Sequence, residues 1–296
     1  MTPCLERRDM SIKTVGIVGC GLMGSGIAQV VAQAGYPTTV VEASQDLLDR
    51  GLGGIRRTLM GLAERGKIPR SDAEATLGRL TGAVDLGALK ACDLVIEAIT
   101  ENIELKKETF ARLDEICPTH AILASNTSSC TITELAAATD RPGQVVGLHF
   151  FNPAPVMKLV EVVRTILTDE ASFKTAWSFV QSLGKTPVAT QDTTGFIVNR
   201  LLVPYLLEAV RLLESGVASK EDIDEAMRLG CGYPMGPFRL LDLVGLDTTM
   251  FVAEVMFAEF REPRFAPPSL LKRLVAAGRL GKKSGQGFYD YAKREA

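Results

Sequence analysis

The first 190 residues alternate short apolar runs with stretches in which apolar residues recur at helical spacing. The short runs predict strands at residues 14–18, 38–41, 94–96, 121–124 and 145–148. The periodic stretches predict helices at 22–34 and 104–116, and Ser44 is a typical N-cap for a long helical region that runs to about Arg65. Strands that alternate with helices in this way predict a parallel sheet with crossover helices.

The pattern changes beyond about residue 190, where no convincing strand follows. Residues 196–213 are apolar nearly all round, which predicts a central buried helix with a kink at Pro204. Further helical runs follow at 220–229, 237–243, 248–260 and 269–277. We therefore expect an α/β domain over residues 1–190, with 1–12 as a tail, and an all-α domain over 191–296.

Composition and charge bear on whether the protein binds nucleic acid or a membrane surface. The 296 residues are 46% apolar and 23% charged, which is typical of a folded globular protein. Lys and Arg number 33 and Asp and Glu number 35, so the net charge is −2, and neither predicted domain carries a large excess of one sign. We expect no nucleic-acid or membrane partner on this basis.

The cysteines and one uncharged stretch indicate in which cell compartment the protein lies and whether it crosses a membrane. The six cysteines include no CxxC pair, which indicates reduced thiols and a cytoplasmic protein. Residues 14–41 lack charged side chains over a length that could span a membrane. That stretch contains six glycines and Pro37, however, and these would break a lipid-exposed helix. A strand, glycine turn, helix and strand of a soluble protein explain it better.

A glycine-rich turn connects the first predicted strand to the first predicted helix. Gly19 permits the tight turn, Gly21 lets a pyrophosphate approach the backbone, and Gly24 lets helix and strand lie close together in the segment GCGLMG. The helix N-terminus supplies N–H groups for the phosphates. Glu42, at the end of the second strand, can accept both ribose hydroxyls and would repel a 2′-phosphate. The pattern predicts binding of NAD rather than NADP, and no metal.

The chain has only two histidines, so candidates for a general base are few. His120 follows a helix stop at Pro118 and suits a surface loop. His149 ends a predicted strand, and Glu161 lies in the apolar run 159–163, where a lone carboxylate would be costly. Residues 149 and 161 are symmetric about position 155, so they could face each other across the intervening loop. Such a pair would stabilise an imidazolium; a structural histidine beside a solvated glutamate is the alternative.

The chain resembles a known family, the 3-hydroxyacyl-CoA dehydrogenases, and most closely the stand-alone bacterial 3-hydroxybutyryl-CoA dehydrogenases. The similarity covers about residues 13 to 292. It rests on segments that occur in the same order: GCGLMG (19–24), EAITEN (97–102), SNTS (125–128), HFFNP (149–153), GFIVN (195–199), YPMGPF (233–238), DLVGLD (242–247) and GKKSGQGF (281–288). The resemblance implies a Rossmann-type domain, a helical domain that forms a homodimer, and a substrate cleft between the two.

The resemblance also implies roles for matching residues. His149 removes the 3-hydroxyl proton of an acyl-CoA substrate while hydride leaves C3 for the nicotinamide, and Glu161 orients His149. Ser128 and Asn199 bind the substrate oxygen and carbonyl region. The matches to positions that contact NAD are Gly19, Gly21, Leu22, Met23, Gly24, Glu42, Glu101, Lys106, Ser128, Asn152 and Lys283.

Coenzyme A suggests a further set of residues. Five basic side chains lie within a short segment, at Arg56, Arg57, Arg65, Lys67 and Arg70, and could meet its phosphates. The family positions that match loosely here are Thr58 and Arg65. A solvated helix face is the alternative for this cluster.

Several of the other residues also have a purely structural explanation. Asn199 could make a structural hydrogen bond at a helix start, and Ser128 could be a turn or cap residue, a role for which Thr131 competes. Glu101 and Lys106 could lie on a solvated helix face. Lys283 could belong to a mobile tail.

Two other functions remain open from the sequence. One is a dehydrogenase of a free hydroxy acid or sugar acid, like the related gulonate dehydrogenases. The other is a non-catalytic NAD-binding protein, like the crystallins that reuse this fold. Retention of His149 and Glu161 disfavours the second, because a non-catalytic protein could lose either residue without penalty.

Overall fold

The structure is a computed structural model that describes residues 11–291. The chain divides into two compact units between Thr193 and Thr194, just after the strand β8 (Thr186–Gln191). The sequence placed this boundary at 190/191. Each unit is described by itself below.

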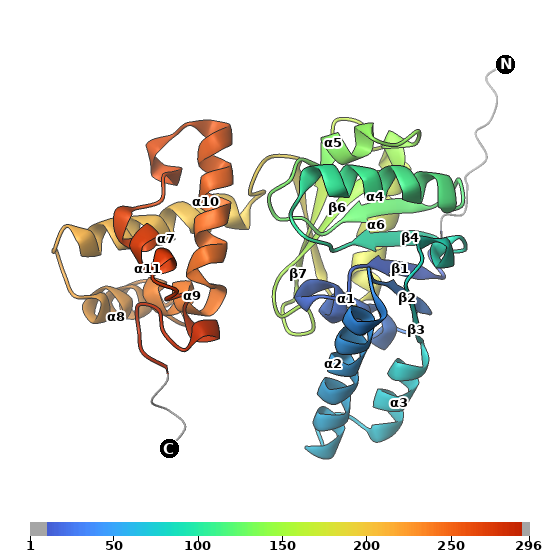
Figure 1. The fold of residues 1–296 in the computed structure, drawn as a ribbon, viewed down its shortest axis with the longest axis horizontal. Coiled ribbons are helices and arrows are strands. Elements are labelled where there is room, and N and C mark those ends of the chain that lie inside the picture. The colour runs from blue at the N-terminus through green and yellow to red at the C-terminus, as the bar shows by residue number, and fades with distance from the viewer. Residues whose placement is uncertain (1–10, 292–296) are drawn as a thin grey trace. The chain divides into compact units, whose positions relative to one another are not determined.

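The first unit is an eight-stranded sheet with helices (Figure 1). The strand order is β3-β2-β1-β4-β5-β6-β7-β8. The other strands are β1 (Val15–Val18), β2 (Thr38–Val41), β3 (Leu80–Ala83), β4 (Leu94–Glu97), β5 (Ile122–Ser125), β6 (Val145–Phe150) and β7 (Leu159–Arg164). The helices are α1 (Leu22–Gln33), α2 (Gln45–Glu64), α3 (Arg70–Gly78), α4 (Ile103–Ile116), α5 (Ile132–Ala137) and α6 (Glu170–Ser182), with 3₁₀ turns η1 (Leu86–Leu89) and η2 (Pro142–Gln144).

The predicted Rossmann-type arrangement is confirmed, with one correction to the strand directions. β1 to β6 pair in parallel, but β7 runs antiparallel to β6 because only a short loop joins them. β8 then pairs in parallel with β7. The central strands β1, β4, β5 and β6 are buried at every position, as expected for a sheet covered on both faces.

The core of this unit explains why its helices form where they do. Ile27 and Val31 of α1, Leu59 of α2 and Val180 of α6 join the inward-facing strand residues in one apolar cluster. Burial of each such side chain contributes roughly 1.5–3 kcal/mol. Ser44 caps α2 as predicted, accepting a hydrogen bond from the backbone of Leu47. Figure 1 shows α2 and α3 as a pair that extends beyond the sheet.

The second unit is helical over residues 194–291, apart from isolated bridges near its end. Its helices are α7 (Val198–Glu214), α8 (Lys220–Gly230), α9 (Pro237–Val244), α10 (Leu246–Phe260) and α11 (Ser269–Ala276), with 3₁₀ turns η3 (Pro263–Phe265) and η4 (Lys282–Ser284). The all-α prediction is confirmed. The expectation that the first helix is buried all round is wrong, because α7 buries Leu206 and Leu207 in the core but leaves Leu201 71% exposed.

The uncharged stretch at residues 14–41 forms β1, α1 and β2, as predicted. Among residues 11–291, none of the helices combines the length and the apolar character that crossing a membrane requires. Of the expected tail at residues 1–12, only residues 11 and 12 are among the described residues. Cys4 lies outside them.

Candidate active site

The predicted catalytic and NAD-binding residues of the first unit gather at one edge of its sheet. The glycine turn follows β1, Glu42 follows β2, Glu101 comes soon after β4, and Ser128 follows β5. His149 lies near the end of β6. Because these strands are parallel, their carboxyl ends meet at one edge, where open α/β sheets bind ligands.

The glycine turn has the geometry that the sequence predicted. Gly19 adopts φ +95°, and a Cβ on Gly24 would lie 1.9 Å from the carbonyl oxygen of Gly19, so only glycine fits there. A Cβ on Gly21 would meet nothing within 4 Å, which leaves this side of the turn open. Among residues 11–291, no side chain caps the start of α1, and its first turn holds no acid. The exposed N–H groups therefore suit a pyrophosphate.

Leu22 and Met23 begin α1 at this turn, and Leu22 is 74% exposed. Glu42 reaches the same turn, since its Oε2 accepts a hydrogen bond from the backbone of Cys20 at 2.7 Å. A carboxylate held beside the glycine turn suits the ribose hydroxyls of NAD. The residues present therefore fit the cofactor.

Cys20 is a small buried residue within the turn. Burial and the nearby Glu42 carboxylate raise the pKa of its thiol to about 11. Gly51 of α2 lies against it, because a Cβ there would come 2.2 Å from the Cys20 sulfur. A protonated, enclosed thiol has no nucleophilic role at neutral pH.

His149 and Glu161 form the pair that the symmetry about residue 155 predicted. They occupy one register position of β6 and β7, and His149 Nδ1 lies 2.7 Å from Glu161 Oε2. Their side chains are 7% and 0% exposed. The ring of Phe151 lies 4.5 Å from the imidazole, centroid to centroid. A carboxylate at Nδ1 favours the tautomer with its proton on Nδ1, which makes Nε2 the atom that can take a proton.

His120 is the exposed histidine that the sequence expected. Its Nε2 lies 2.9 Å from an Asp93 oxygen, and its side chain is half exposed. Burial alone would raise the pKa of Asp93, but hydrogen bonds from His120 and from the backbone of Lys13 and Thr14 hold it below its usual range. The pair joins two surface segments.

Ser128 lies in a loop after β5 that we call the Ser128 loop (residues 126–130). The carboxylate of Glu101 binds this loop: it accepts from Thr127 Oγ1 at 2.7 Å, from Ser128 N at 3.0 Å and from Ser128 Oγ at 3.4 Å. Burial alone would raise the pKa of Glu101, but the nearby Lys106 ammonium and the hydrogen bonds from the loop hold it below its usual range. Glu101 is therefore ionised at neutral pH.

Lys106 is not on a solvated helix face, which was one interpretation of the sequence. Its side chain is 1% exposed, and its Nζ lies 2.6 Å from Oε1 of Glu97. Sequence reasoning did not single out Glu97, although an acid that ends an apolar strand is the same signal that marked Glu42.

Asn152 lies in the exposed part of the loop between β6 and β7, where its peptide bond to Pro153 is cis. Ala154 of this loop is buried beside α1, since a Cβ on Gly26 would lie 3.2 Å from Ala154 Cβ. Lys185 holds the loop as well, because its ammonium donates to the carbonyls of Ala154 and Met157 at 2.6 Å. No pattern in the sequence pointed to Lys185.

The helical unit contains two of the predicted residues. Asn199 is the second residue of α7 and is partly buried. Lys283 lies in η4 with its Nζ 2.7 Å from Oδ2 of Asp247. The segment that follows Lys283 is not a mobile tail, because its backbone is held at Phe288 and Tyr289 by hydrogen bonds to the buried carboxylate of Asp242.

The predicted coenzyme A residues Thr58 and Arg65 lie exposed, Thr58 on α2 and Arg65 at its C-cap. The hydroxyl of Thr58 donates to the carbonyl of Gly54. The basic cluster is exposed throughout, and Arg70 forms an ion pair with Glu74. The basic residues therefore lie on α2, on the turn beyond it and at the start of α3.

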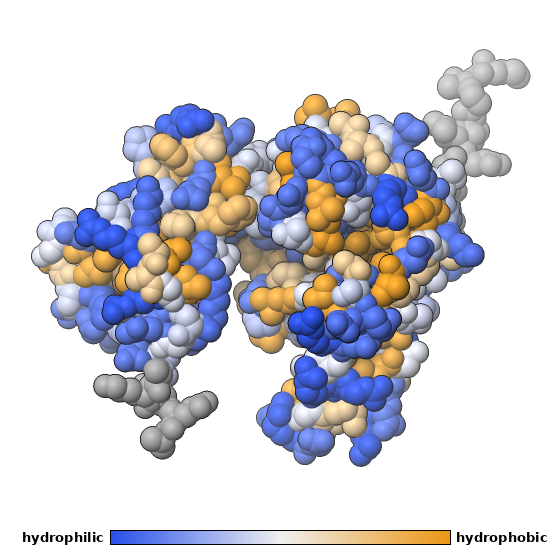
Figure 2. Space-filling view, viewed as in Figure 1, coloured by the Kyte–Doolittle hydropathy of each residue, from blue (hydrophilic) through white to orange (hydrophobic). Residues whose placement is uncertain are grey.

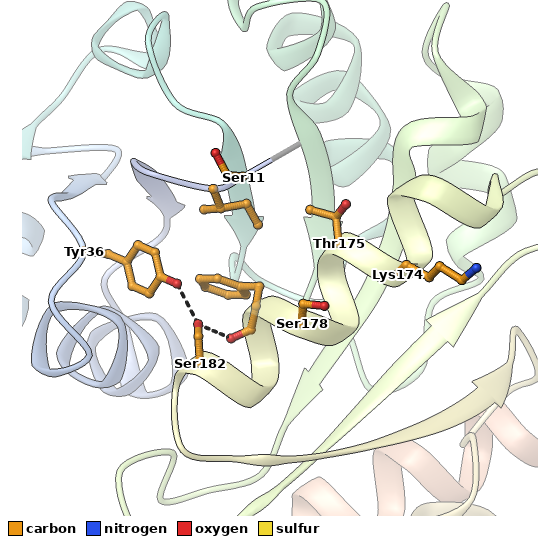
Figure 3. A pocket seen from close by; sticks show the side chains of 8 residues that line it. Ser11, Tyr36, Lys174, Thr175, Ser178 and Ser182 are labelled. Atoms are coloured by element: carbon orange, nitrogen blue, oxygen red, sulfur yellow. Dashed lines mark hydrogen bonds between the residues drawn. The ribbon is translucent and has the colours of Figure 1, made fainter. Parts of the chain in front are cut away.

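A surface hollow of about 460 Å³ lies at a different part of this unit (Figure 3). It is bordered by α6, by Ser11 before β1 and by Tyr36 before β2, and so lies at the amino ends of these strands. Tyr36 and Ser182 point toward each other there, with their hydroxyl oxygens 2.6 Å apart. Its lining includes none of the predicted site residues.

Two family models match this chain. The 3-hydroxyacyl-CoA dehydrogenase NAD-binding domain matches residues 14–193, and the 3-hydroxyacyl-CoA dehydrogenase C-terminal domain matches residues 195–291. The 3-hydroxybutyryl-CoA dehydrogenase of Mycobacterium tuberculosis is 50% identical over 283 residues, which cover 95% of this chain and 99% of the relative. The mitochondrial hydroxyacyl-coenzyme A dehydrogenase of Mus musculus is 51% identical over 291 residues, which cover 96% of this chain and 93% of the relative.

A solved structure agrees with these relatives. The (S)-3-hydroxybutyryl-CoA dehydrogenase from Ralstonia eutropha superposes with a TM-score of 0.91 at 44% identity, covering 96% of this chain and 100% of that one. A sheet domain that matches an NAD-binding domain, together with relatives that are dehydrogenases, defines an NAD-dependent oxidoreductase. The chain belongs to the 3-hydroxyacyl-CoA dehydrogenase family, as its motifs predicted.

Proposed function

We propose that this protein oxidises short-chain (S)-3-hydroxyacyl-CoA, such as 3-hydroxybutyryl-CoA, reversibly to 3-oxoacyl-CoA, with His149 and Glu161 as the general-base pair. The observation that carries this proposal is the buried contact of 2.7 Å between the two side chains near the carboxyl end of β6. When bound, NAD supplies the acceptor for the hydride that leaves C3.

The proton follows a separate route in this proposal. His149 Nε2 takes the proton of the 3-hydroxyl as the C3–O bond gains double-bond character. Glu161 then balances the positive imidazolium, which would be costly in so buried a position without a carboxylate. In the reverse direction the imidazolium returns the proton to the carbonyl oxygen.

Other residues bind the two ligands in this proposal. Ser128 and Asn199 donate hydrogen bonds to the substrate oxygen and carbonyl region. The glycine turn with Leu22 and Met23 holds the pyrophosphate, Glu42 the ribose, and Glu101, Asn152 and Lys283 contact the cofactor further along. Thr58 and Arg65 meet coenzyme A, for which the exposed basic cluster supplies the charge.

We propose that the protein is cytoplasmic and forms a homodimer through the helical unit. The five cysteines of the described residues are free thiols, which suits a reducing compartment. The helical unit exposes large apolar side chains such as Leu201, Val217 and Leu229, and Figure 2 shows apolar residues among charged ones on this unit. Such exposure favours a protein partner. A mass of about one chain in solution, measured by light scattering, would contradict the dimer.

The decisive experiment is acetoacetyl-CoA-dependent oxidation of NADH. We expect turnover by the wild type, and a loss of about 10²–10⁴-fold in kcat for His149→Ala, the usual contribution of a general base. His120→Ala is the matched control, because His120 also pairs with a carboxylate but at the surface. No turnover by the wild type, or full activity of His149→Ala, would refute the proposal.

The same assay separates the two alternative functions. Equal rates with free acetoacetate and with its coenzyme A thioester would favour a hydroxy-acid dehydrogenase. NAD binding without turnover of any 3-hydroxyacyl-CoA would favour a non-catalytic protein.

A further inference from the structure

A buried carboxylate outside the predicted site lies at the end of β4. Glu97 is 0% exposed, and its Oε1 accepts hydrogen bonds from Lys106 Nζ at 2.6 Å and from Ile99 N at 2.7 Å. Its Oε2 accepts from Ser125 Oγ at 2.6 Å. Burial of such an ion pair is costly unless each group is fully hydrogen-bonded. The arrangement around Glu97 therefore favours one geometry.

Glu97 is connected to the Ser128 loop through the neighbouring strand. Glu97 and Ser125 are register partners of β4 and β5. Ser125 Oγ donates to Glu97 and in turn accepts from the backbone of Thr127 at 3.1 Å. Thr127 directly precedes Ser128, so this contact holds the start of the turn that presents Ser128.

A second connection passes through the ammonium of Lys106. Lys106 Nζ, paired with Glu97, also lies 3.5 Å from Oε2 of Glu101. Glu101 accepts the hydrogen bonds from Ser128 N and Thr127 Oγ1 described above. One ammonium thus faces two carboxylates. The negative charge of Glu97 competes with that of Glu101 for the Lys106 ammonium, so it limits the attraction between Lys106 and Glu101.

We propose that Glu97 is a positioning residue for the dehydrogenase reaction, which holds the Ser128 loop in its working geometry through Ser125 and, by way of Lys106, through Glu101. The inference rests on the proposed role of Ser128 at the substrate oxygen. In this proposal Lys106 acts on the cofactor site through Glu101 and not by direct contact, since its side chain is almost completely buried.

The proposal makes a specific prediction for Glu97→Gln. The amide lacks the charge that balances Lys106, so the ammonium turns toward Glu101 and draws that carboxylate away from the loop. We expect kcat/KM with acetoacetyl-CoA to fall about 10- to 100-fold, which is the order of loss expected when one hydrogen bond to a reacting group is misplaced. We expect Ser128→Ala to lose a similar amount.

A double-mutant cycle separates positioning from general damage. If Glu97 acts through Ser128, the Glu97→Gln/Ser128→Ala variant should be no slower than Ser128→Ala alone. A purely structural role would make the two losses multiply. The control is Glu104→Gln, which removes the carboxylate of a surface ion pair with Lys107 on the same helix and should leave the rate unchanged.

A second variant guards against a protein that fails to fold. Glu97→Gln/Lys106→Met removes both buried charges, so its thermal unfolding should be close to that of the wild type while its activity stays low. Wild-type activity of Glu97→Gln, or of this neutral variant, would overturn the inference, as would multiplicative losses in the cycle. Full activity of Ser128→Ala would instead refute the proposed role of Ser128 and, with it, the inference. If Ser128→Ala loses activity while Glu97→Gln keeps it, only the inference about Glu97 is refuted.

Discussion

Nδ1 of His149 lies 2.7 Å from Oε2 of Glu161 across the β6–β7 pair, and both side chains are almost completely buried. The contact offsets a desolvation cost that either group would carry alone. It also orients the imidazole, because the ring nitrogen that faces the carboxylate carries the proton.

Replacement of Glu161 by Gln should therefore impair catalysis. An amide cannot balance an imidazolium, and it no longer enforces one tautomer, so we expect kcat to fall by roughly 10²–10⁴-fold with little change in the KM for NADH. Steady-state kinetics with acetoacetyl-CoA measure this. Asp93→Asn is the matched control, since it removes the carboxylate partner of exposed His120 and should leave kcat unchanged. An unaltered kcat in Glu161→Gln would contradict the assigned pair.

The stability of the first unit should depend on the ionisation of Glu101. Its pKa is held below the usual range in the folded state, where the opposing effect of burial is outweighed by Lys106 and by the loop hydrogen bonds. Such a carboxyl stabilises the fold above its unfolded pKa, about 4.3, and this contribution is lost as the pH falls through the lower folded pKa. The difference in unfolding free energy between wild type and Glu101→Gln should thus shrink on acidification below about pH 4.3.

The chain offers a convenient signal for this measurement. Trp177 is the single tryptophan of the sequence and packs against the core of the first unit from α6. Urea unfolding followed by its fluorescence at a series of pH values gives the two free energies. A difference that grows on acidification would show that the sign of the pKa shift is wrong.

Glu42 should decide the choice between the two nicotinamide cofactors. We expect Glu42→Ala to raise the KM for NADH about 10-fold or more, since a hydrogen bond to a charged group contributes about 1.5–3 kcal/mol. The preference for NADH over NADPH should fall in parallel, because the repulsion of the 2′-phosphate is removed. The ratio of kcat/KM for the two cofactors tests this, with Glu64→Ala, an exposed acid at the end of α2, as the control. An unchanged ratio would show that Glu42 does not contact the ribose of the cofactor.

Arg65 should act on the nucleotide part of coenzyme A and not on the acyl group. We expect Arg65→Ala to raise the KM for acetoacetyl-CoA roughly 3- to 10-fold, as for loss of an exposed charge contact, and to leave the KM for acetoacetyl-pantetheine unchanged. Lys174→Ala, which removes an exposed cation on α6, is the control. Equal effects on both thioesters would mean that Arg65 does not meet the phosphates.

Much of the cofactor site could be read from local patterns. The glycine spacing at 19, 21 and 24, with a strand before and a helix after, specifies one backbone path, because larger side chains would collide at Gly19 and Gly24. The helices of the second unit follow from apolar residues at helical spacing, which holds whatever lies beside them. The facing of His149 and Glu161 could also be predicted, since a short loop between adjacent strands leaves few registers.

Other features depend on segments that are far apart in the chain. Glu97 and Ser125 are brought together by the pairing of β4 with β5, and Lys106 becomes buried only because α4 lies on the sheet beside them. In the same way Asp242 meets Phe288 and Tyr289 only in the folded helical unit. A sequence pattern shows which positions are apolar, but the partner that makes a buried charge tolerable is supplied by packing, and it becomes visible only once distant strands and helices are in contact.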